Sequence, residues 1–466
     1  MFDNHKRGDF KPYVYVTTNQ GRSWRPITGD LPKRGTVHTI AEDHVDPNLL
    51  FVGTEFGVFF TQNSGENWIE LTSLPTIAVR DLEIQRRETD LVVGTFGRGV
   101  YILDDYSALR TPKSVVQGAE ATLFPVKDSW LYIEGDRWGS TGGAQGYQGD
   151  NFFAAPNPGY GVQFTYYLKS ALDGRRSQRR QAEIKREKEN KDTPYPSWEA
   201  LRQEDEELKP KLLIEIRNAK GDVVVRRIDA KTAKGLHRIS WDMRLSAPDP
   251  IDLQAPEPSN FAQRPIGPLA TPGQYSARLV KQIDGKNLGI DSGQNFQLNS
   301  LELSPEQTDD PEALQRFQLE VAQLLRAVAG AQKSSAELRD RIAHLRQALD
   351  LTDAAGSDEQ ALLATLLSQL NQIDTTLNGD ATRRSRNEPA PLSISNRVFL
   401  IRRDAWKSQA PATGVHRDSY QIAADEFTEV MQRLGKVHQE LQDVESTLEQ
   451  QGAPWTPGRL PIWPPR

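Results

Sequence analysis

The sequence of 466 residues contains no cysteine and only 3 methionines. Without cysteine the chain forms no disulfide and no thiolate metal site, although this absence does not choose a cellular compartment. No run approaches the roughly 18 apolar residues that a membrane-spanning helix needs, so we expect no membrane span. No signal-peptide pattern is visible in this sequence either.

A large excess of charge of one sign is also lacking. The 57 Lys and Arg residues face 63 Asp and Glu residues, which gives a formal net charge of −6, so no basic field argues for nucleic acid. Glycine-rich phosphate loops and a nucleophile elbow are absent, and we expect no cofactor. The histidines are scattered without metal-ligand spacing, so we expect no metal site. They are His5, His38, His44, His237, His344, His416 and His438.

An octapeptide of the form Thr-x-Asn-x-Gly-x-x-Trp occurs twice, 44 residues apart. We expect its Asn to hydrogen-bond backbone groups of its own turn, its Gly to take a positive φ, and its Trp ring to cover the turn. None of these roles is catalytic, so we interpret the octapeptides as structural rather than as ligand contacts. Their defining residues are Thr17, Asn19, Gly21 and Trp24 in the first copy and Thr61, Asn63, Gly65 and Trp68 in the second.

The repeat extends beyond the octapeptide. Residues 53–60 (GTEFGVFF) align with residues 94–101 (GTFGRGVY) when one residue of slack is allowed. β-Rich and alternating runs precede both segments and predict further strands. A repeat of this length with four strands is typical of a β-propeller blade. The predicted strands are 36–40, 49–52 and 58–60 in one repeat and 78–84, 91–93 and 100–102 in the next.

We therefore predict a partial β-propeller over residues 1–110, with about two and a half blades. One blade is complete over about 35–73. A propeller closes with typically four to eight blades, and a partial ring leaves open sheet flanks. We expect this chain to be the C-terminal part of a longer protein. The alternative is that a partner chain supplies the missing blades.

The octapeptide resembles the Asp-box, or BNR repeat, of sialidase-like and sortilin-like β-propellers, with Asn19 and Asn63 where Asp is usual. The most specific segment is 74–105, which contains LPTIAVRDL and DLVVGTFGRGVYILDD. It is similar to a group of large bacterial proteins labelled sortilin-like or BNR-repeat glycosyl hydrolase-like. That family usually has His at the position of Phe96, and a Phe side chain cannot take over a chemical role of that His.

The Asp-box topology implies a ligand face on the side of the propeller opposite the octapeptides. Turns between the second and third strands and the entries to the innermost strands meet there. Carboxylates, guanidinium groups and aromatic rings at these positions suit glycan or peptide recognition. The alternative is that Arg80–Asp81 and Arg98–Asp104 are structural ion pairs. The candidate residues of this face are His38, Glu55, Phe56, Arg80, Asp81, Phe96 and Arg98.

A glycine-rich bridge over 111–154 leads to a predicted immunoglobulin-like β-sandwich over 155–300. Short predicted strands with turn residues between them favour that fold. Their order resembles the flagellar-hook-capping type of immunoglobulin-like domain, through Pro156-Asn157-Pro158, the hairpin 218–221 and the segment 235–242. The strands are predicted at 162–168, 212–216, 223–225, 237–242 and 274–280.

A strongly charged insertion over 171–211 interrupts the sandwich. Mixed charge of this kind is typical of a solvated helix or a mobile insertion. We expect Tyr195 and Trp198 within it to anchor the insertion against the body of the domain.

From about residue 310 the apolar period becomes helical, which predicts a helical bundle over 305–451. The last helix carries a heptad seam that can pack within the chain or against another subunit, so self-association through helices 310–451 is an alternative to an internal bundle. A proline-rich tail over 452–466 is expected to lie along the surface. The seam residues are Tyr420, Ala423, Phe427, Val430, Leu434, Val437, Leu441, Val444 and Leu448.

Two functions fit this organisation. We favour a recognition protein of the cell envelope or exterior, extracellular or periplasmic, whose propeller binds a glycan or a protein without catalysis by this chain. The alternative is the C-terminal part of a BNR-repeat glycoside hydrolase whose catalytic residues lie on missing blades. The paired carboxyl groups of a glycosidase cannot be assembled from two and a half blades. Catalytic residues therefore stay unassigned, and fold alone does not establish activity.

Overall fold

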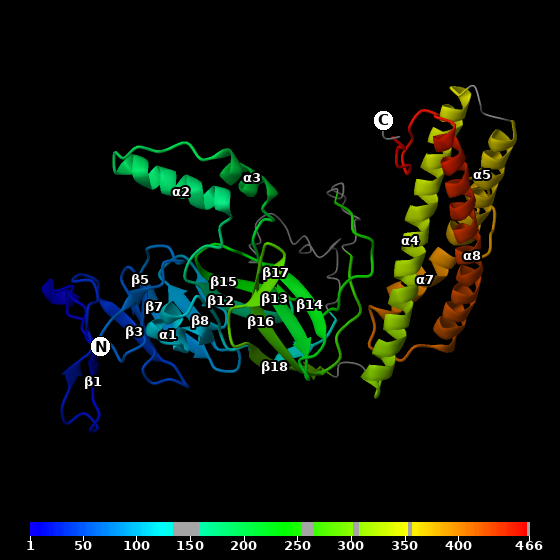
Figure 1. Ribbon diagram of the computed structural model, residues 1–466. Helices are drawn as coiled ribbons and strands as arrows, with labels where there is room; N and C mark the ends of the chain where they lie inside the picture. Colours follow the sequence, from blue (N-terminus) through cyan, green and yellow to red (C-terminus); the bar gives the residue numbers. More distant parts are fainter. Residues whose placement is uncertain (134–157, 254–264, 302–306, 353–356, 464–466) are drawn as a thin grey trace. The chain divides into compact units, whose positions relative to one another are not determined.

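A computed structural model describes residues 1–133, 158–253, 265–301, 307–352 and 357–463 (Figure 1). These residues combine several small β-sheets with helices in a multidomain arrangement. The glycine-rich bridge from Gly135 to Gly149, the dipeptide Pro156-Asn157 and the last residues of the proline-rich tail lie outside the described residues. The chain divides into two compact units: Met1–Asp128, Ala155–Asp242 and Gln274–Gln297 form the first, and Ser129–Ala154, Met243–Gly273 and Leu298–Arg466 form the second.

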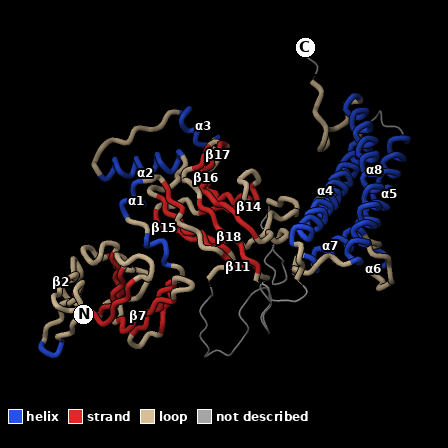
Figure 2. The backbone as a smooth tube through the Cα atoms, turned by 90° about the horizontal axis from the view of Figure 1, so that it is seen from below, coloured by secondary structure: helices blue, strands red, loops and turns tan. Residues whose placement is uncertain are grey.

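Three antiparallel sheets follow one another in the N-terminal part of the first unit. Their strands lie where the repeat predicts them, and Figure 2 shows β7 among the strands of this part. A 3-10 helix, η1 (His5–Arg7), precedes them. The sheets are β1 (Tyr15–Val16) with β2 (Arg25–Pro26); β3 (Val37–Glu42), β4 (Leu50–Thr54), β5 (Gly57–Thr61) and β6 (Ile69–Glu70); and β7 (Val79–Gln85), β8 (Asp90–Thr95) and β9 (Val100–Leu103).

The four-stranded sheet is covered on both faces. Every residue of β4 and β5 is buried, as expected for strands packed between two layers. On one face Val52 and Phe59 share a core with Val14 and Val16 of the β1 segment. On the other face Phe51 and the rest of a second core pack against β7, β8 and β9. The three sheets therefore form a stack held by two apolar layers.

Both octapeptides fold into the same turn. The Thr17 hydroxyl accepts a hydrogen bond from the amide of Gly21 (2.9 Å), and the Asn19 side-chain oxygen accepts one from the amide of Ser23 (2.9 Å). In the second copy Thr61 and Asn63 accept the equivalent bonds, both at 3.0 Å. The two glycines have φ of 84° and 89°, a left-handed conformation that favours glycine.

The two octapeptide tryptophans differ in burial. Trp68 is 7% exposed and donates from Nε1 to the carbonyl of Ile27, in the preceding repeat, at 3.1 Å. Trp24 is 56% exposed, although its ring lies over its own turn as expected, where a Cβ added at Gly21 would be 3.8 Å from it. The reason is positional: Trp68 packs against the sheet before it, and no described sheet precedes β1.

A short helical segment takes the place of a fourth strand after β9. The 3-10 helix η2 (Tyr106–Arg110) contributes Tyr106 to the core between the second and third sheets. The Gln62 side chain donates to the carbonyls of Leu109 (2.5 Å) and Thr111 (2.9 Å). The helix α1 (Lys113–Gly118) follows.

Two further sheets pack face to face. Phe164 of one and Phe296 of the other are in edge contact at 5.8 Å, and Trp241 meets Tyr275 at 5.7 Å. The first sheet has the order β10 (Ala121–Leu123), β12 (Val162–Leu168), β15 (Gly235–Trp241). The second has the order β11 (Ser129–Leu131), β18 (Gln294–Ser300), β16 (Gly273–Ile283), β13 (Lys211–Asn218), β14 (Val224–Ala230), with β17 (Lys286–Gly289) on β16.

The strands predicted from sequence are β12 to β16. The short strands β10 and β11 lie in the segment expected to be an irregular bridge, because they pair with strands far along the chain. Pairing between strands so far apart in the chain cannot be predicted from the local sequence pattern.

The charged insertion forms α2 (Arg175–Lys188) and α3 (Trp198–Glu206). Arg179 joins them by donating to both carboxylate oxygens of Glu204, at 2.5 and 2.8 Å. Tyr195 and Trp198 are 77% and 71% exposed, so the expected aromatic anchor was wrong. A polar contact with the body holds the insertion instead: a guanidinium nitrogen of Arg175 donates to Asp284, which lies between β16 and β17, at 3.1 Å.

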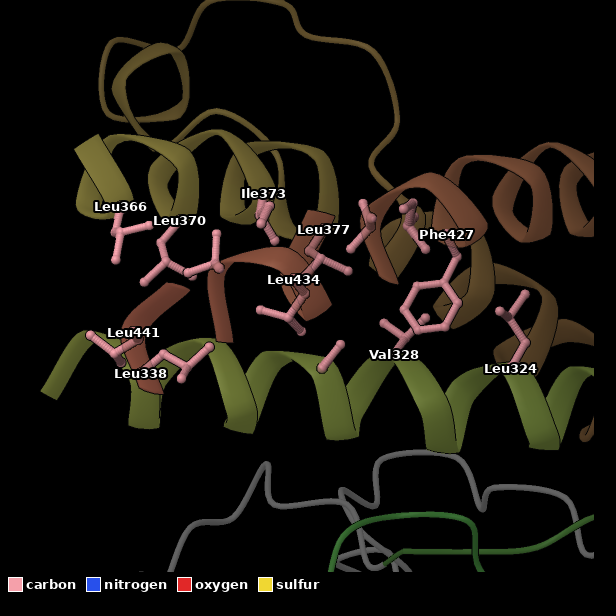
Figure 3. Packing of buried hydrophobic residues seen from close by; sticks show 14 of the residues in the cluster. Leu324, Val328, Leu338, Leu366, Leu370, Ile373, Leu377, Phe427, Leu434 and Leu441 are labelled. Carbon is pink, nitrogen blue, oxygen red and sulfur yellow. The ribbon is translucent and has the colours of Figure 1, made fainter. Parts of the chain in front are cut away.

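The C-terminal helices enclose one apolar core (Figure 3). They are α4 (Pro311–Asp350), α5 (Ser357–Asn378), α7 (Ile394–Ala405) and α8 (Gly414–Gln450), whereas the short α6 (Ala381–Arg384) has no buried residue. Leu338 of α4, Leu370 of α5 and Leu441 of α8 point toward one another in Figure 3. The predicted heptad seam of α8 is buried in this core or, at Tyr420, packed against it. The seam therefore packs within the chain, which favours the internal bundle over self-association through the seam.

A buried ion pair and the start of the tail complete this unit. Arg341 of α4 donates two hydrogen bonds to Glu445 of α8, and both side chains are almost fully buried. After α8 the chain is not helical, as the prolines predict. The Arg459 guanidinium is buried and donates to the carbonyl of Ala453 at 3.1 Å, while Trp463 is exposed.

Candidate ligand-binding site

The candidate residues lie at one end of the second and third sheets. His38 is on β3, and Arg80 and Asp81 are on β7. Glu55 belongs to the β4–β5 turn, whose amide at Glu55 donates to the carbonyl of Thr36 at 3.0 Å. The β8–β9 turn is held in the same way, because the amide of Phe96 donates to the carbonyl of Ala78 at 2.9 Å. Each turn is therefore fixed beside the start of its own first strand.

Three of the candidate residues are in direct contact. A guanidinium nitrogen of Arg80 lies 3.3 Å from Nδ1 of His38, at hydrogen-bond distance. The same guanidinium lies over the Phe96 ring, 5.3 Å from its centre. Phe96 itself is 68% exposed. The arrangement presents a flat apolar ring to solvent with a planar cation fixed beside it.

His38 sits in the inner part of this group. Burial lowers its pKa, the positive charge of Arg80 lowers it further, and Asp3 and Glu55 act in the opposite direction. Because guanidinium groups only donate, Nδ1 accepts from Arg80 and the proton of the neutral ring is on Nε2. That Nε2 is buried and has no hydrogen-bond partner in the described part of the chain.

The other candidates are more loosely connected. The Phe56 ring covers Gly35, where an added Cβ would lie 3.1 Å from the ring. Asp81 accepts a hydrogen bond from the amide of Leu82 at 3.0 Å. Among the described residues, no hydrogen bond, ion pair or ring contact joins Asp81 or Arg98 to the Arg80–Phe96 pair.

The alternative interpretation of this face, as a set of structural ion pairs, has no support in the geometry. The salt bridges between described residues include neither Arg80–Asp81 nor Arg98–Asp104. The backbone of Asp104 is held otherwise, because Arg238 donates to its carbonyl at 2.7 Å. The side chains of Arg80, Asp81 and Arg98 are therefore not engaged in these two expected ion pairs.

Sequence analysis missed two residues that act on the site. The side chains of Asp3 and His5 are 2.6 Å apart, and both charges affect the pKa of His38. They belong to the segment before β1, for which neither strand periodicity nor the repeat makes a prediction. Only the folding of that segment brings them near β3.

The described residues contain no group of three or more His, Asp and Glu side chains arranged to hold a metal ion. Within the same residues, no helix has the length and apolar character to cross a membrane.

The second unit contains a cavity of about 300 Å³. Its polar side chains already bond to the protein: Gln318 donates to the carbonyl of Ala405 at 2.8 Å, and Gln315 to that of Leu269 at 3.2 Å. None of the candidate residues lines this cavity. We therefore look for ligand contacts at the Arg80–Phe96 pair rather than in the cavity.

Comparisons with known proteins do not place the chain in a family. No family model matches the sequence, and no curated protein matches it. Two solved structures that show a likeness are those of an ancestral GH74 enzyme and of the extracellular domain of a candidate one-component system from B. thetaiotaomicron. The identities are 24% and 12%, over 19% and 62% of this chain, and the TM-score is 0.17 in both cases. The chain spans 11% and 28% of those two chains.

Proposed function

We propose that this chain is part of a secreted or cell-envelope protein whose N-terminal sheets recognise a glycan or protein ligand without catalysis by this chain. In this proposal the three stacked sheets are sectors of an Asp-box β-propeller of the sortilin-like or BNR-repeat kind. The two packed sheets after them are an immunoglobulin-like spacer. The proposed location is extracellular or periplasmic.

One observation carries the proposal: the Arg80 guanidinium lies 5.3 Å from the centre of the exposed Phe96 ring. An exposed ring offers an apolar platform for the C–H face of a sugar or for an apolar side chain. The adjacent cation and the carboxylates of Glu55 and Asp81 supply hydrogen bonds that fix orientation. A glycan fits this combination best, because sugar rings combine an apolar face with hydroxyl groups at the edge.

The exposure of the Phe96 ring is not by itself evidence of a binding site, because single large apolar side chains are common on protein surfaces. What distinguishes Phe96 from scattered surface rings is the second anchored group. Arg80 is held from the other side by His38, so its planar fork is oriented before any ligand arrives. Holding the Arg80 side chain in one orientation costs conformational entropy in the free protein. Less entropy is therefore lost when a ligand binds.

The test is a glycan-array screen with the whole chain, followed by calorimetric titration of any glycan that binds. We expect Phe96→Ala and Arg80→Lys each to weaken binding about tenfold or more, because one removes the ring and the other the planar fork. Phe399→Ala is the matched control, because Phe399 is 51% exposed on α7 in the other unit.

The possible outcomes separate the functions. Binding that Phe96→Ala leaves intact, or no binding to any glycan or to envelope proteins, contradicts the proposal. Turnover of a bound glycan by this chain would contradict recognition without catalysis. Turnover only by a longer protein that carries the missing blades would support the glycoside hydrolase alternative instead.

A further inference from the structure

The contact between His38 and Arg80 depends on the protonation state of His38. In the neutral ring Nδ1 accepts a hydrogen bond from the Arg80 guanidinium at 3.3 Å, and the proton is on Nε2. A second proton can therefore go only to Nδ1, which removes the acceptor that Arg80 uses. The protonated ring also places a positive charge beside the guanidinium, and two like charges at this separation repel each other. One proton thus turns the attraction into a repulsion.

The charged groups that act on His38 come from three parts of the fold. They are Asp3 and His5 in the segment before β1, Glu55 in the β4–β5 turn and Arg80 on β7. The carboxylates of Asp3 and Glu55 favour the protonated ring, whereas Arg80 and His5 oppose it. A protonated His38 is therefore drawn toward the two carboxylates and pushed away from Arg80. Each protonation state of the ring has its own partners.

The change falls on the acid side of neutrality. Burial lowers the pKa of His38 below 6.5, and the positive charge of Arg80 lowers it further. At neutral pH the ring is therefore uncharged, and its contact with Arg80 is formed. The contact is complete above pH 6.5 and is lost as the pH falls through the lowered pKa.

Loss of this contact frees the Arg80 side chain. In the described part of the chain, the Arg80 guanidinium has no hydrogen-bond partner other than His38. It lies 5.3 Å from the centre of the Phe96 ring, which is 68% exposed. Without His38 the guanidinium regains its rotamer freedom beside that ring. A ligand held by the ring and the guanidinium together must then pay the entropy of ordering Arg80 again.

We propose that the His38–Arg80 contact is an acid-operated switch of the candidate site, in which protonation of His38 releases Arg80 and weakens ligand binding. The effect on a ligand rests on the proposed function, whereas the release of Arg80 takes place with or without a ligand. We expect the affinity for the ligand to fall about tenfold between about pH 8 and about pH 5. Carboxylates of ordinary pKa stay mostly ionised over this range.

Fluorine NMR of the whole chain with Phe96→4-fluorophenylalanine tests the release without any ligand. The signal of the ring senses whether a cation lies beside it, so we expect it to shift between about pH 8 and about pH 5. His38→Asn should abolish the shift, because its side-chain oxygen stands near the position of Nδ1, accepts from Arg80 and does not titrate. The same shift with and without His38→Asn, or no shift in either protein, overturns the proposal.

Two other histidines provide the controls. His344 lies on α4, in the other compact unit, so His344→Asn should keep the shift. His5→Asn removes the second histidine of the group and should keep it as well, because Arg80 is bonded to His38. Loss of the shift in either control overturns the proposal.

Calorimetric titration then tests the consequence for a ligand, with the glycan that the array identifies as the probe. The wild type should bind more weakly at the lower pH, and His38→Asn should bind equally at both. His38→Ala, which leaves Arg80 without an acceptor, should bind weakly at both. Equal wild-type affinity at the two pH values, or stronger binding in acid, overturns the proposal. If no glycan binds, the proposed function fails, and the fluorine signal alone decides whether the switch exists.

Discussion

Arg110 donates two hydrogen bonds of 2.9 Å to Asp43, 67 residues earlier in the chain. The Asp43 side chain is fully buried, and Tyr106 donates a third bond to it at 2.6 Å. Burial alone would raise the pKa of Asp43, but the bonds from Arg110 and Tyr106 outweigh it and hold that pKa well below its ordinary value. This group fastens η2 to the turn after β3. The helix η2 follows β9, at the position where a fourth strand of the third sheet would begin.

Replacing Asp43 by Asn should loosen this attachment. The change leaves the Arg110 guanidinium without its anionic partner, and removing one member of a largely buried pair costs about 3 kcal/mol. Hydrogen exchange of peptides covering η2 and β3 should show faster exchange in Asp43→Asn. Asp46→Asn is the control, because the half-buried Asp46 side chain bonds only within its own turn. Equal exchange in both variants would contradict the assigned role of Asp43.

The buried Glu215 should make the stability of the two packed sheets sensitive to acid. Its carboxylate is 2% exposed, and it accepts hydrogen bonds from Arg217, Arg278 and Arg227. Burial acts to raise the pKa, but these three bonds outweigh it and lower the pKa of Glu215 from 4.5 to about 2.

The sign of the pH effect follows from the lowered pKa. The ionised carboxylate stabilises the fold fully above pH 4.5, and that contribution is lost as pH falls toward 2. The contribution of the ionised Glu215 carboxylate to the free energy of unfolding is about 3 kcal/mol. We expect exchange protection of β13 to fall between pH 4.5 and 2 in the wild type and to change much less in Glu215→Gln. The same fall in both proteins would show that other groups dominate.

The two octapeptide glycines form a matched pair. Gly21 and Gly65 have nearly the same positive φ, so alanine adds backbone strain of about 1 kcal/mol at each. At Gly65 the new Cβ would lie 2.6 Å from the carbonyl oxygen of Ile27, whereas at Gly21 the nearest atom is 3.8 Å away. We expect Gly65→Ala to lower the thermal midpoint clearly more than Gly21→Ala. Equal shifts would mean that the contact between the first two sheets is looser than described.

The helical core should respond to a single leucine. Leu366 of α5 is fully buried, so Leu366→Ala should lower the unfolding free energy by about 3 kcal/mol through lost burial and a cavity. Leu319 of α4 is 40% exposed, and Leu319→Ala should cost about 1 kcal/mol or less. Urea unfolding followed by far-ultraviolet circular dichroism gives both values. A small effect at Leu366 would contradict a tightly packed bundle.

Local patterns predicted most of the strands and long helices. The positions of β3 to β5 and of β7 to β9 follow from alternation and from the repeat, because both are properties of neighbouring residues. The seam of α8 follows from heptad spacing in the same way. The short helix α7 was missed, since no apolar period in that segment was singled out, although Val398 and Ile401 are buried in the bundle.

The contacts among the candidate residues were predicted only in part. The sequence placed His38, Arg80 and Phe96 at one end of the sheets, but which of them touch depends on how β3 and β7 pack. The approach of Asp3 and His5 to His38 had no sequence signal at all.

The sequence by itself determined the period of the repeat, the turn chemistry of the octapeptides and the apolar stripes of the helices. These depend on residues within a few positions of one another, whose geometry the backbone fixes. Tertiary structure alone decided that Trp68 is buried while Trp24 is exposed, and that one face of the third sheet is open. Burial depends on which surfaces meet in space, and two copies of one sequence pattern meet different neighbours at different places in a stack.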